Sequence, residues 1–409
     1  MFSQKAYVTI TWPGKDSGIF KGSDKDMGSQ NTVRELSGAP KAQRNSNIEL
    51  LRIVAMLMIA AYHYSIYSFY AEDLYSSCGK YFIDLIGNYG KTGVNLFVMI
   101  SGYYLAKQEF SVKRLLKIAG QLWFYSLFAL AIAVFVFGYS ADMGILRRSI
   151  FPITGGYYWF ASYYVMLLLL SPLLNRFAAG IGNDKLRLSI LLLLLLYSIL
   201  PTFFRVYIFF TEQGWFVTLY LTAAYLRLYG GADPAAKKSG IWRALVWGAC
   251  IPAFAWVCTF AGSRTGGVSL MELSGRLGTD SSFFGYMFAL GLLRYFLSRE
   301  PVCIPAVNTL ASATFGVYLF HENIFARDVL GIWSVMLDPA QYINSSLLPL
   351  QALGTIVIVY LVGTAVDLLR QATAGRLWDK AVDKLSPKLE QFGRKALSLL
   401  TSAAGKRGF

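Results

Sequence analysis

The stretch from Leu188 to Leu200 reads LSILLLLLLYSIL, and its continuous apolar character decides the fold class. A strand of a membrane barrel would alternate apolar and polar residues over about ten positions, which this stretch does not do. Similar apolar blocks recur along the chain, each near the ~20 residues that an α-helix needs to cross the hydrocarbon layer. Inside that layer a helix satisfies its own backbone polar groups. The sequence therefore predicts an all-α membrane protein.

Composition agrees with this fold class. Of the 409 residues, 55% are hydrophobic and only 15% are charged, whereas soluble domains carry about 25% charged residues. We expect a polytopic bundle of about ten transmembrane helices, over residues 48–70, 82–106, 115–138, 157–175, 187–204, 213–229, 241–260, 282–298, 306–330 and 347–369. Pro201 and Arg205 interrupt the apolar run from Leu188 to Phe210, so we expect the fifth or the sixth helix to be displaced or kinked there.

The two ends of the chain differ from this transmembrane domain, which covers residues 48–370. Residues 1–47 are polar and have no hydrophobic period, which predicts a disordered cytoplasmic tail. Residues 371–409 are basic, and their apolar side chains from Leu377 to Leu385 recur at helical spacing. Such a cytoplasmic tail lies in the interface of the inner leaflet or forms a solvated helix without a special role.

The net charge of +15 comes from 38 Lys and Arg against 23 Asp and Glu. These basic residues flank the apolar blocks, as in the cytoplasmic loops of membrane proteins, so the expected partner is the lipid bilayer and not nucleic acid. The loops richer in Lys and Arg place both termini in the cytoplasm, in a multi-pass protein of the cell membrane. The four cysteines show no CxxC pairing and there are only two histidines, so we expect neither a disulfide framework nor a metal site.

The first predicted span contains two residues that are rare inside membranes, Arg52 and His63. Eleven positions along a helix advance about 16 Å and about three turns, so both residues share one helical face. Arg52, near the cytoplasmic surface, suits an anionic ligand, and His63, near mid-membrane, suits proton transfer near neutral pH. Alternatively, Arg52 extends to the lipid headgroups and His63 is a hydrogen-bonded packing residue.

A basic group opens the third predicted span, with Lys113, Arg114 and Lys117 on one helical face. Charge-assisted contacts from this face would hold the phosphates of a nucleotide-type ligand such as coenzyme A. The same residues also keep this end of the helix in the cytoplasm, and the two uses are compatible.

The ninth predicted span carries His321 and Glu322 toward the outer half of the membrane. An imidazole beside a carboxylate can orient a hydroxyl acceptor or tune proton transfer. Alternatively, Glu322 forms an interfacial ion pair with Arg327.

Two further positions have both a structural and a functional interpretation. Ser101 lies among small residues of the second span, which permit close helix packing or leave a thin face along which a substrate could run. Trp159 opens the fourth span, where an aromatic residue belongs to the interfacial belt or stacks on a sugar ring.

Five motifs in the same order resemble the bacterial acyltransferase 3 family of integral membrane O-acyltransferases. They are Arg52 with His63 in the first span, FVMISGY at residues 97–103, the basic opening of the third span, Trp159-Phe160 with the later SPLLN at 171–175, and TFGVYLFHE at 314–322. The resemblance covers about residues 45–370.

The resemblance implies that residues 48–370 form an acyltransferase domain that takes an acyl group, usually acetyl, from acetyl-CoA. The acceptor would be a carbohydrate hydroxyl at or beyond the outer face, with Arg52 and His63 as the essential pair. The family often has Arg-x-x-Arg at the third span, whereas this chain has Arg114 and Lys117, which keeps the charge but not the bidentate fork. Several relatives carry a fused extracytoplasmic domain that this chain has no room for, so it acylates its acceptor directly or a separate extracytoplasmic protein completes the transfer.

The sequence thus predicts a membrane O-acetyltransferase of a cell-surface or lipid-linked glycan. His63 would be the general base or a transient acyl carrier, and Arg52, Lys113, Arg114 and Lys117 would bind coenzyme A. The acceptor would lie against His321, Glu322, Ser101 and Trp159. The competing class is a transporter or flippase of a lipid-linked glycan, which would leave acetyl-CoA unchanged, and a scaffold would tolerate the loss of both histidines.

Overall fold

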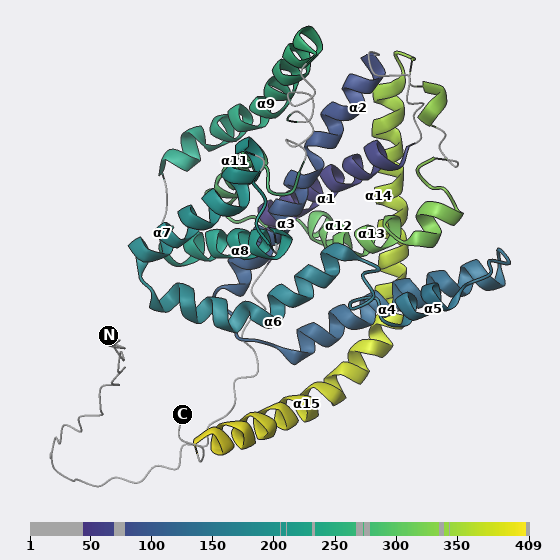
Figure 1. Ribbon diagram of the computed structural model, residues 1–409. Coiled ribbons are helices and arrows are strands. Elements are labelled where there is room, and N and C mark those ends of the chain that lie inside the picture. The colour runs from purple at the N-terminus through teal and green to yellow at the C-terminus, as the bar shows by residue number, and fades with distance from the viewer. Residues whose placement is uncertain are drawn as a thin grey trace, which may run out of the picture. The chain divides into compact units, whose positions relative to one another are not determined.

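The computed structural model (Figure 1) describes residues 44–68, 78–204, 206–209, 211–230, 234–266, 273, 279–334, 339–342 and 344–405. Within these ranges the regular elements are helices, with no β-strand. The predicted disordered tail lies outside the described residues apart from its last four positions. Helix α1 (Ser46–Tyr67) begins there, with Asn45 as its cap, since the Asn45 side chain accepts a hydrogen bond from the backbone of Asn47.

In the part of the chain that the structure describes, six helices are long and apolar enough to cross a membrane. They are α1 (Ser46–Tyr67), α4 (Val112–Phe135), α6 (Trp159–Gly180), the continuous helix Asn183–Phe204, the Gly240–Gly262 part of α9 (Pro234–Thr265), and α14 (Leu348–Ala372). The all-α membrane fold is therefore confirmed. The helix after Asn183 is α7 (Asn183–Leu194), which passes into a π-helix, η2 (Leu195–Phe204), around Pro201. This irregularity lies where the sequence predicts a kink.

The remaining four predicted spans are interrupted, short or less apolar, so the count of about ten crossings stays a prediction. The second is divided at Tyr89 into α2 (Cys78–Asn88) and α3 (Gly90–Leu105). The sixth, α8 (Thr211–Tyr229), carries charges at both ends, and the eighth, α11 (Phe283–Leu297), has 15 residues. The ninth is divided into α12 (Pro305–Ser312), α13 (Thr314–His321) and η3 (Phe325–Val329). Broken helices are tolerated at membrane depth where protein surrounds them, and α3 is buried from Thr92 to Ile100.

Helix α1 packs most extensively against α3 and also contacts α2, α12, α13 and α14. Glycines of α3 permit this approach: a Cβ at Gly93 would lie 2.4 Å from the carbonyl oxygen of Ala55, and one at Gly90 would lie 1.9 Å from the Cβ of Tyr62. The small residues of the second predicted span therefore serve close packing at these two positions.

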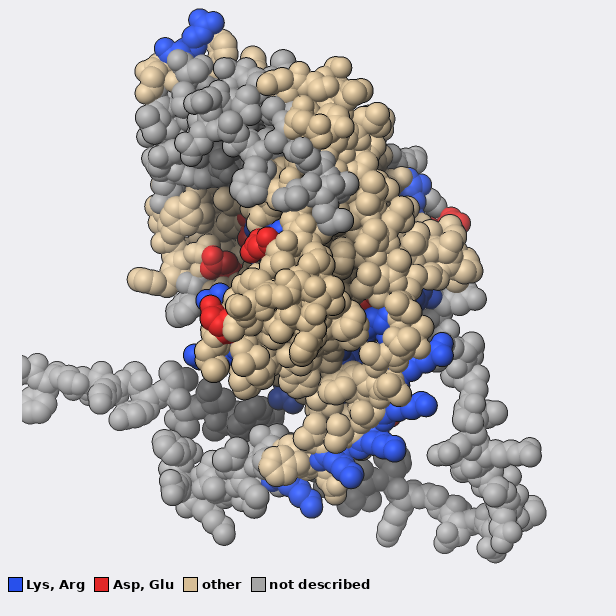
Figure 2. Space-filling view, turned by 90° about the vertical axis from the view of Figure 1, so that its right-hand side faces the viewer, with Lys and Arg blue, Asp and Glu red and all other residues tan. Residues whose placement is uncertain are grey.

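The C-terminal segment forms α15 (Ala374–Gly405), which packs against α4. The Trp378 indole donates to the carbonyl oxygen of Leu116 across 2.9 Å. A Cβ at Gly120 would lie 2.0 Å from that indole, so glycine is what leaves room for Trp378 on α4. Figure 2 shows Lys and Arg side chains gathered at the lower end of the face that it presents, below a broad area of uncharged side chains. Exposed basic residues of α15 are Arg376, Lys380, Lys384, Lys388 and Lys395.

Candidate active site

The two histidines of the chain meet in the interior. His63, in the last part of α1, has a 4% exposed side chain, and His321, the last residue of α13, is fully buried. The Nδ1 atom of His63 lies 2.9 Å from the Nε2 atom of His321. A hydrogen bond between two imidazole nitrogens needs one donor and one acceptor, so the two rings share one proton along this line.

The other nitrogen of His63 faces a carboxylate. Its Nε2 atom lies 3.2 Å from the Oε2 atom of Glu322, which is also buried. The Oε1 atom of Glu322 accepts from the hydroxyl of Tyr67 at 3.0 Å and from Arg327 at 3.4 Å. The predicted ion pair of Glu322 with Arg327 is therefore present, and the other carboxylate oxygen faces His63, whereas the role of Glu322 in orienting an acceptor stays a prediction. An imidazole oriented by a carboxylate is the arrangement of a general base.

Helix α13 reaches this position because its start packs closely on α14. A Cβ at Gly316 would lie 2.1 Å from the Cγ atom of Asp367, a fully buried residue of α14. Asp367 accepts hydrogen bonds from the Tyr125 hydroxyl at 3.0 Å, from Arg370 at 2.7 Å and from Gln371 at 2.7 Å. Asp367 was not among the predicted site residues, although ionisable residues inside a predicted span are rare enough to identify it.

The end of α13 is held by Asn323. Its side-chain amide donates to the carbonyl oxygen of Tyr125 at 3.0 Å and to the hydroxyl of Tyr158 at 2.8 Å, so it connects α13 to α4 and to the start of α6. Behind the histidine, the Trp333 indole donates to the carbonyl oxygen of His321. These contacts fix the backbone that presents His321 and Glu322 to α1.

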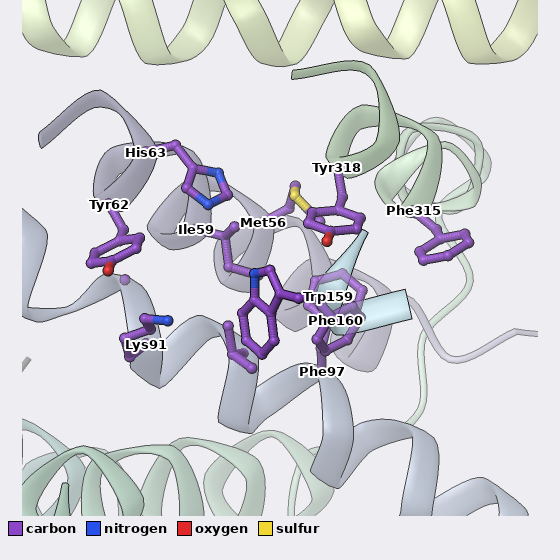
Figure 3. Close-up of a pocket in the computed structure, with 12 residues that line it drawn as sticks. Met56, Ile59, Tyr62, His63, Lys91, Phe97, Trp159, Phe160, Phe315 and Tyr318 are labelled. Atoms are coloured by element: carbon purple, nitrogen blue, oxygen red, sulfur yellow. The ribbon is translucent and has the colours of Figure 1, made fainter. Parts of the chain in front are cut away.

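His63 forms part of the wall of a cavity of about 400 Å³, a volume that includes its opening (Figure 3). Apolar and aromatic side chains from α1, α3, α6 and α13 form most of the wall, and its residues are Met56, Ile59, Tyr62, His63, Gly90, Lys91, Val94, Phe97, Trp159, Phe160, Phe315 and Tyr318. Trp159 is therefore a residue of the cavity wall, and its contact with a substrate stays a prediction. Ser101 is half-buried on α3 and is not among the described residues of this wall.

Lys91 also lines the cavity, and it was not among the predicted site residues. Its ammonium lies 3.0 Å from the Oδ1 atom of Asp280, and it lies over the rings of Tyr62 and Trp159 at 4.8 and 4.7 Å from their centroids. The signal was present, because a lysine inside the predicted span 82–106 is as rare as the arginine and histidine of the first span.

Arg52 lies on the same unbroken helix as His63 but not in the cavity. Its guanidinium pairs with the buried Glu49 at 3.3 Å and lies 5.7 Å from the centroid of the Tyr104 ring. Near it, Arg227 of α8 donates to the hydroxyl of Tyr103 at 3.2 Å. The structure thus keeps Arg52 and His63 at two levels of α1, about 16 Å apart along the helix.

The basic opening of α4 faces α15. Lys113 pairs with Asp383 at 2.6 Å, and Lys117 pairs with Asp379 at 3.0 Å. The hydrogen bond from Lys113 lowers the pKa of the exposed Asp383 carboxyl, so this pair is ionised at neutral pH. Arg114 instead donates to the side chain of Gln108. The three predicted coenzyme A ligands are therefore together, but both lysines already have a carboxylate partner.

Comparison with known proteins places the chain in a family. The acyltransferase 3 model, described as an acyltransferase domain, matches residues 45–367. No curated protein and no solved structure matches the chain. Within the described residues, no group of three or more His, Cys, Asp and Glu side chains could hold a metal ion. The family match extends from the start of α1 to Asp367 and includes both histidines and Glu322. The resemblance that the motifs indicated is therefore confirmed. The chain belongs to the acyltransferase 3 family and is a membrane acyltransferase.

Proposed function

We propose that the protein is an O-acyltransferase that moves an acetyl group from acetyl-CoA to a hydroxyl of a cell-surface or lipid-linked carbohydrate. One observation carries this proposal: His63, in the wall of an aromatic cavity, lies between the imidazole of His321 and the carboxylate of Glu322. That arrangement suits removal of a proton from a hydroxyl, which is what O-acylation requires of its acceptor.

In this mechanism the Nδ1 atom of His63 exchanges its contact with His321 for one with the acceptor hydroxyl and accepts the proton of that hydroxyl. The oxygen then attacks the thioester carbonyl carbon, the carbon–sulfur bond breaks, and the proton leaves with the sulfur as the thiol of coenzyme A. Glu322 stabilises the imidazolium that forms, and Tyr67 and Arg327 hold Glu322 in place. In the variant of this mechanism with a covalent relay, a nitrogen of His63 attacks the thioester carbon, the carbon–sulfur bond breaks, and the sulfur leaves as the thiol with the imidazole proton. The acceptor hydroxyl then takes the acetyl group from His63 and returns its own proton to the ring.

The donor end of the pathway would lie at the cytoplasmic side, where Arg52 and the group of Lys113, Arg114 and Lys117 meet the phosphates of coenzyme A. The ion pairs of Lys113 and Lys117 with α15 are compatible with coenzyme A binding. The side chains of Lys113 and Asp383 are 49% and 57% exposed, and exposed pairs contribute only about 0–1 kcal/mol. A polyanionic ligand can therefore displace Asp379 and Asp383 at small cost.

The acceptor end would be the cavity and the residues behind it. Trp159 presents an aromatic surface that suits a sugar ring, and His321 and Glu322 position the acceptor hydroxyl through their contacts with His63. Ser101 would contact substrate only along the α3 face between the two ends. About ten crossings, with both termini cytoplasmic in the cell membrane, would place acetyl-CoA inside and the glycan outside. If the acetyl group reaches the glycan only outside the cell membrane, a separate extracytoplasmic protein would be the partner that completes its transfer.

The experiment is transfer of labelled acetyl from acetyl-CoA to membrane glycan by wild-type protein and by His63→Gln at matched expression. Glutamine keeps a polar side chain but cannot take up a proton, so transfer should fall at least 10²–10⁴-fold, as expected for the loss of general base catalysis, while coenzyme A still binds. A wild-type protein that moves lipid-linked glycan without consuming acetyl-CoA would be a flippase and would refute the proposal. Full transfer by His63→Gln would refute the role of the imidazole.

A further inference from the structure

Lys91 occupies an unusual position for a charged residue of a membrane protein. It is the second residue of α3, and its side chain is 16% exposed. Among the described residues of the cavity wall, Lys91 is the one lysine, arginine or carboxylate side chain. A charge at this depth is costly, and such residues mark functional sites by default.

The neighbours of Lys91 hold its ammonium at one point of the cavity wall. Asp280 approaches it to 3.0 Å, and the backbone of Asp280 is in turn fixed, because Asn95 of α3 donates to its carbonyl oxygen at 3.0 Å. The fully buried Asn95 accepts from the indole of Trp215 at 3.0 Å. The rings of Tyr62 and Trp159 confine the ammonium further (Figure 3). The charge is therefore preorganised and does not move freely.

The same cavity contains the proposed base. His63 follows Tyr62 directly in α1, and their ring centroids are 5.6 Å apart. The ring of Tyr62 thus neighbours both the imidazole of His63 and the ammonium of Lys91. An ammonium has three donors, and Asp280 is the carboxylate that the described residues place beside it. Donors remain for an oxygen atom that enters the cavity near His63.

We propose that Lys91 is a catalytic residue, which binds the carbonyl oxygen of the acetyl group during transfer; this role rests on the proposed function. When the acceptor oxygen attacks the carbonyl carbon, the hydroxyl proton passes to His63 and the carbonyl π electrons move to the oxygen. Lys91 donates to this oxyanion. When the carbon–oxygen double bond forms again, the carbon–sulfur bond breaks, and the sulfur takes the proton from His63. A preorganised donor in a water-poor cavity stabilises such charge far more than a donor in water does.

The test uses the full chain in nanodiscs, acetyl-CoA labelled in its acetyl group, and membranes of the native host as the acceptor. Lys91→Met keeps the length of the side chain without its charge, and Lys91→Arg keeps the charge. The matched control is Lys185→Met, the same change at an exposed lysine of α7. We expect Lys91→Met to lower kcat about 10²–10³-fold, as for loss of one oxyanion donor. The Kd for coenzyme A should change less than about twofold, since the donor's phosphates bind elsewhere. Lys91→Arg should recover part of kcat, and Lys185→Met should match wild type.

Three outcomes would overturn this role. Lys91→Met with wild-type kcat excludes it directly. An unchanged kcat with a raised KM for the acceptor membranes assigns Lys91 to an anionic group of the acceptor. Equal loss of thermal stability and activity in Lys91→Met and Lys91→Arg makes Lys91 a structural partner of Asp280. A wild-type protein that binds acetyl-CoA but never transfers its acetyl group overturns the proposed function itself, which is a different result from any of these.

Discussion

The Nδ1 atom of His63 lies 2.9 Å from the Nε2 atom of His321, although 258 positions separate the two residues in the chain. With Glu322 at 3.2 Å from the opposite nitrogen, His63 has an acid–base partner on each side. This geometry supports the assignment of His63 as the base, because each partner limits the tautomer and the orientation of the ring.

Replacing Glu322 by glutamine should keep the hydrogen bond that orients this side chain but remove its negative charge. The amide still accepts from Tyr67, but it cannot stabilise an imidazolium at His63, so we expect kcat to fall about 10²–10⁴-fold. Tyr67→Phe removes one hydrogen bond to Glu322, worth about 0.5–1.5 kcal/mol, and should lower kcat no more than about tenfold. Steady-state transfer rates check both variants. Equal rates for Glu322→Gln and wild type would show that the carboxylate takes no part in proton transfer.

Arg52→Ala should act on the donor and not on the chemical step. Charge-assisted hydrogen bonds contribute about 1.5–3 kcal/mol each, so the Kd for coenzyme A should rise about 10–100-fold. The variant also leaves the buried Glu49 without its ion pair, so Glu49→Gln serves as the control and should bind coenzyme A normally. Calorimetry on purified protein makes the measurement. Unchanged affinity in Arg52→Ala would remove this residue from the donor site.

Two double variants at the contact between α4 and α15 should change the affinity for coenzyme A in opposite directions. Asp379→Asn with Asp383→Asn frees Lys117 and Lys113, and coenzyme A should bind more tightly, by up to about fivefold for each exposed pair that no longer competes. Arg114→Ala with Lys117→Ala should weaken binding, whereas Lys117→Arg should be tolerated. The same titration covers all of these variants. If neither double variant changes the affinity, the phosphates bind away from α4.

Asp367→Asn should destabilise the protein. The substitution removes the charge that pairs with Arg370, whose side chain is only 13% exposed, and breaking a buried pair from one side typically costs about 3–5 kcal/mol. Thermal unfolding in detergent should show a lower midpoint. Gly316→Ala, which forces a Cβ against Asp367, should shift the midpoint in the same direction. A wild-type midpoint for Asp367→Asn would mean that neutral hydrogen bonds to Tyr125 and Gln371 are enough to hold this side chain between α4 and α14.

Gly120→Val tests whether Trp378 keeps α15 on α4. The added carbons would occupy the place of the indole, which a Cβ would meet at 2.0 Å, so α15 should detach from α4. The expected result is a loss of cross-linking between cysteines introduced at Lys113 and Asp383, which pair at 2.6 Å in the native protein. Gly393→Val, at a glycine with open space around it, is the matched control. Undiminished cross-linking in Gly120→Val would show that the remaining contacts, among them the Lys117–Asp379 pair, hold the helix without Trp378.

Much of the candidate site was visible in the sequence because ionisable residues are conspicuous in apolar segments. His63, His321 and Glu322 were identified in this way, and the structure brings them together. Lys91 and Asp367 carry the same signal and were missed. The positions of the helix breaks at Tyr89 and Ala313 were not predicted, because a broken helix inside an apolar block depends on the protein that surrounds it. Trp159 had two interpretations, and only the tertiary structure shows that it belongs to the cavity wall.

The sequence by itself determined the properties that depend on near neighbours along the chain. Apolar blocks of sufficient length predict helices in a membrane, and the spacing of Arg52 and His63 places them at two levels of one helix, since helical geometry is local. Only the tertiary structure decided which residues meet across helices: His63 with His321, Lys91 with Asp280, and Lys113 with Asp383. Such pairs depend on which glycines let helices approach and on how side chains fill the space between them. Hydropathy along a single chain carries no information about that packing.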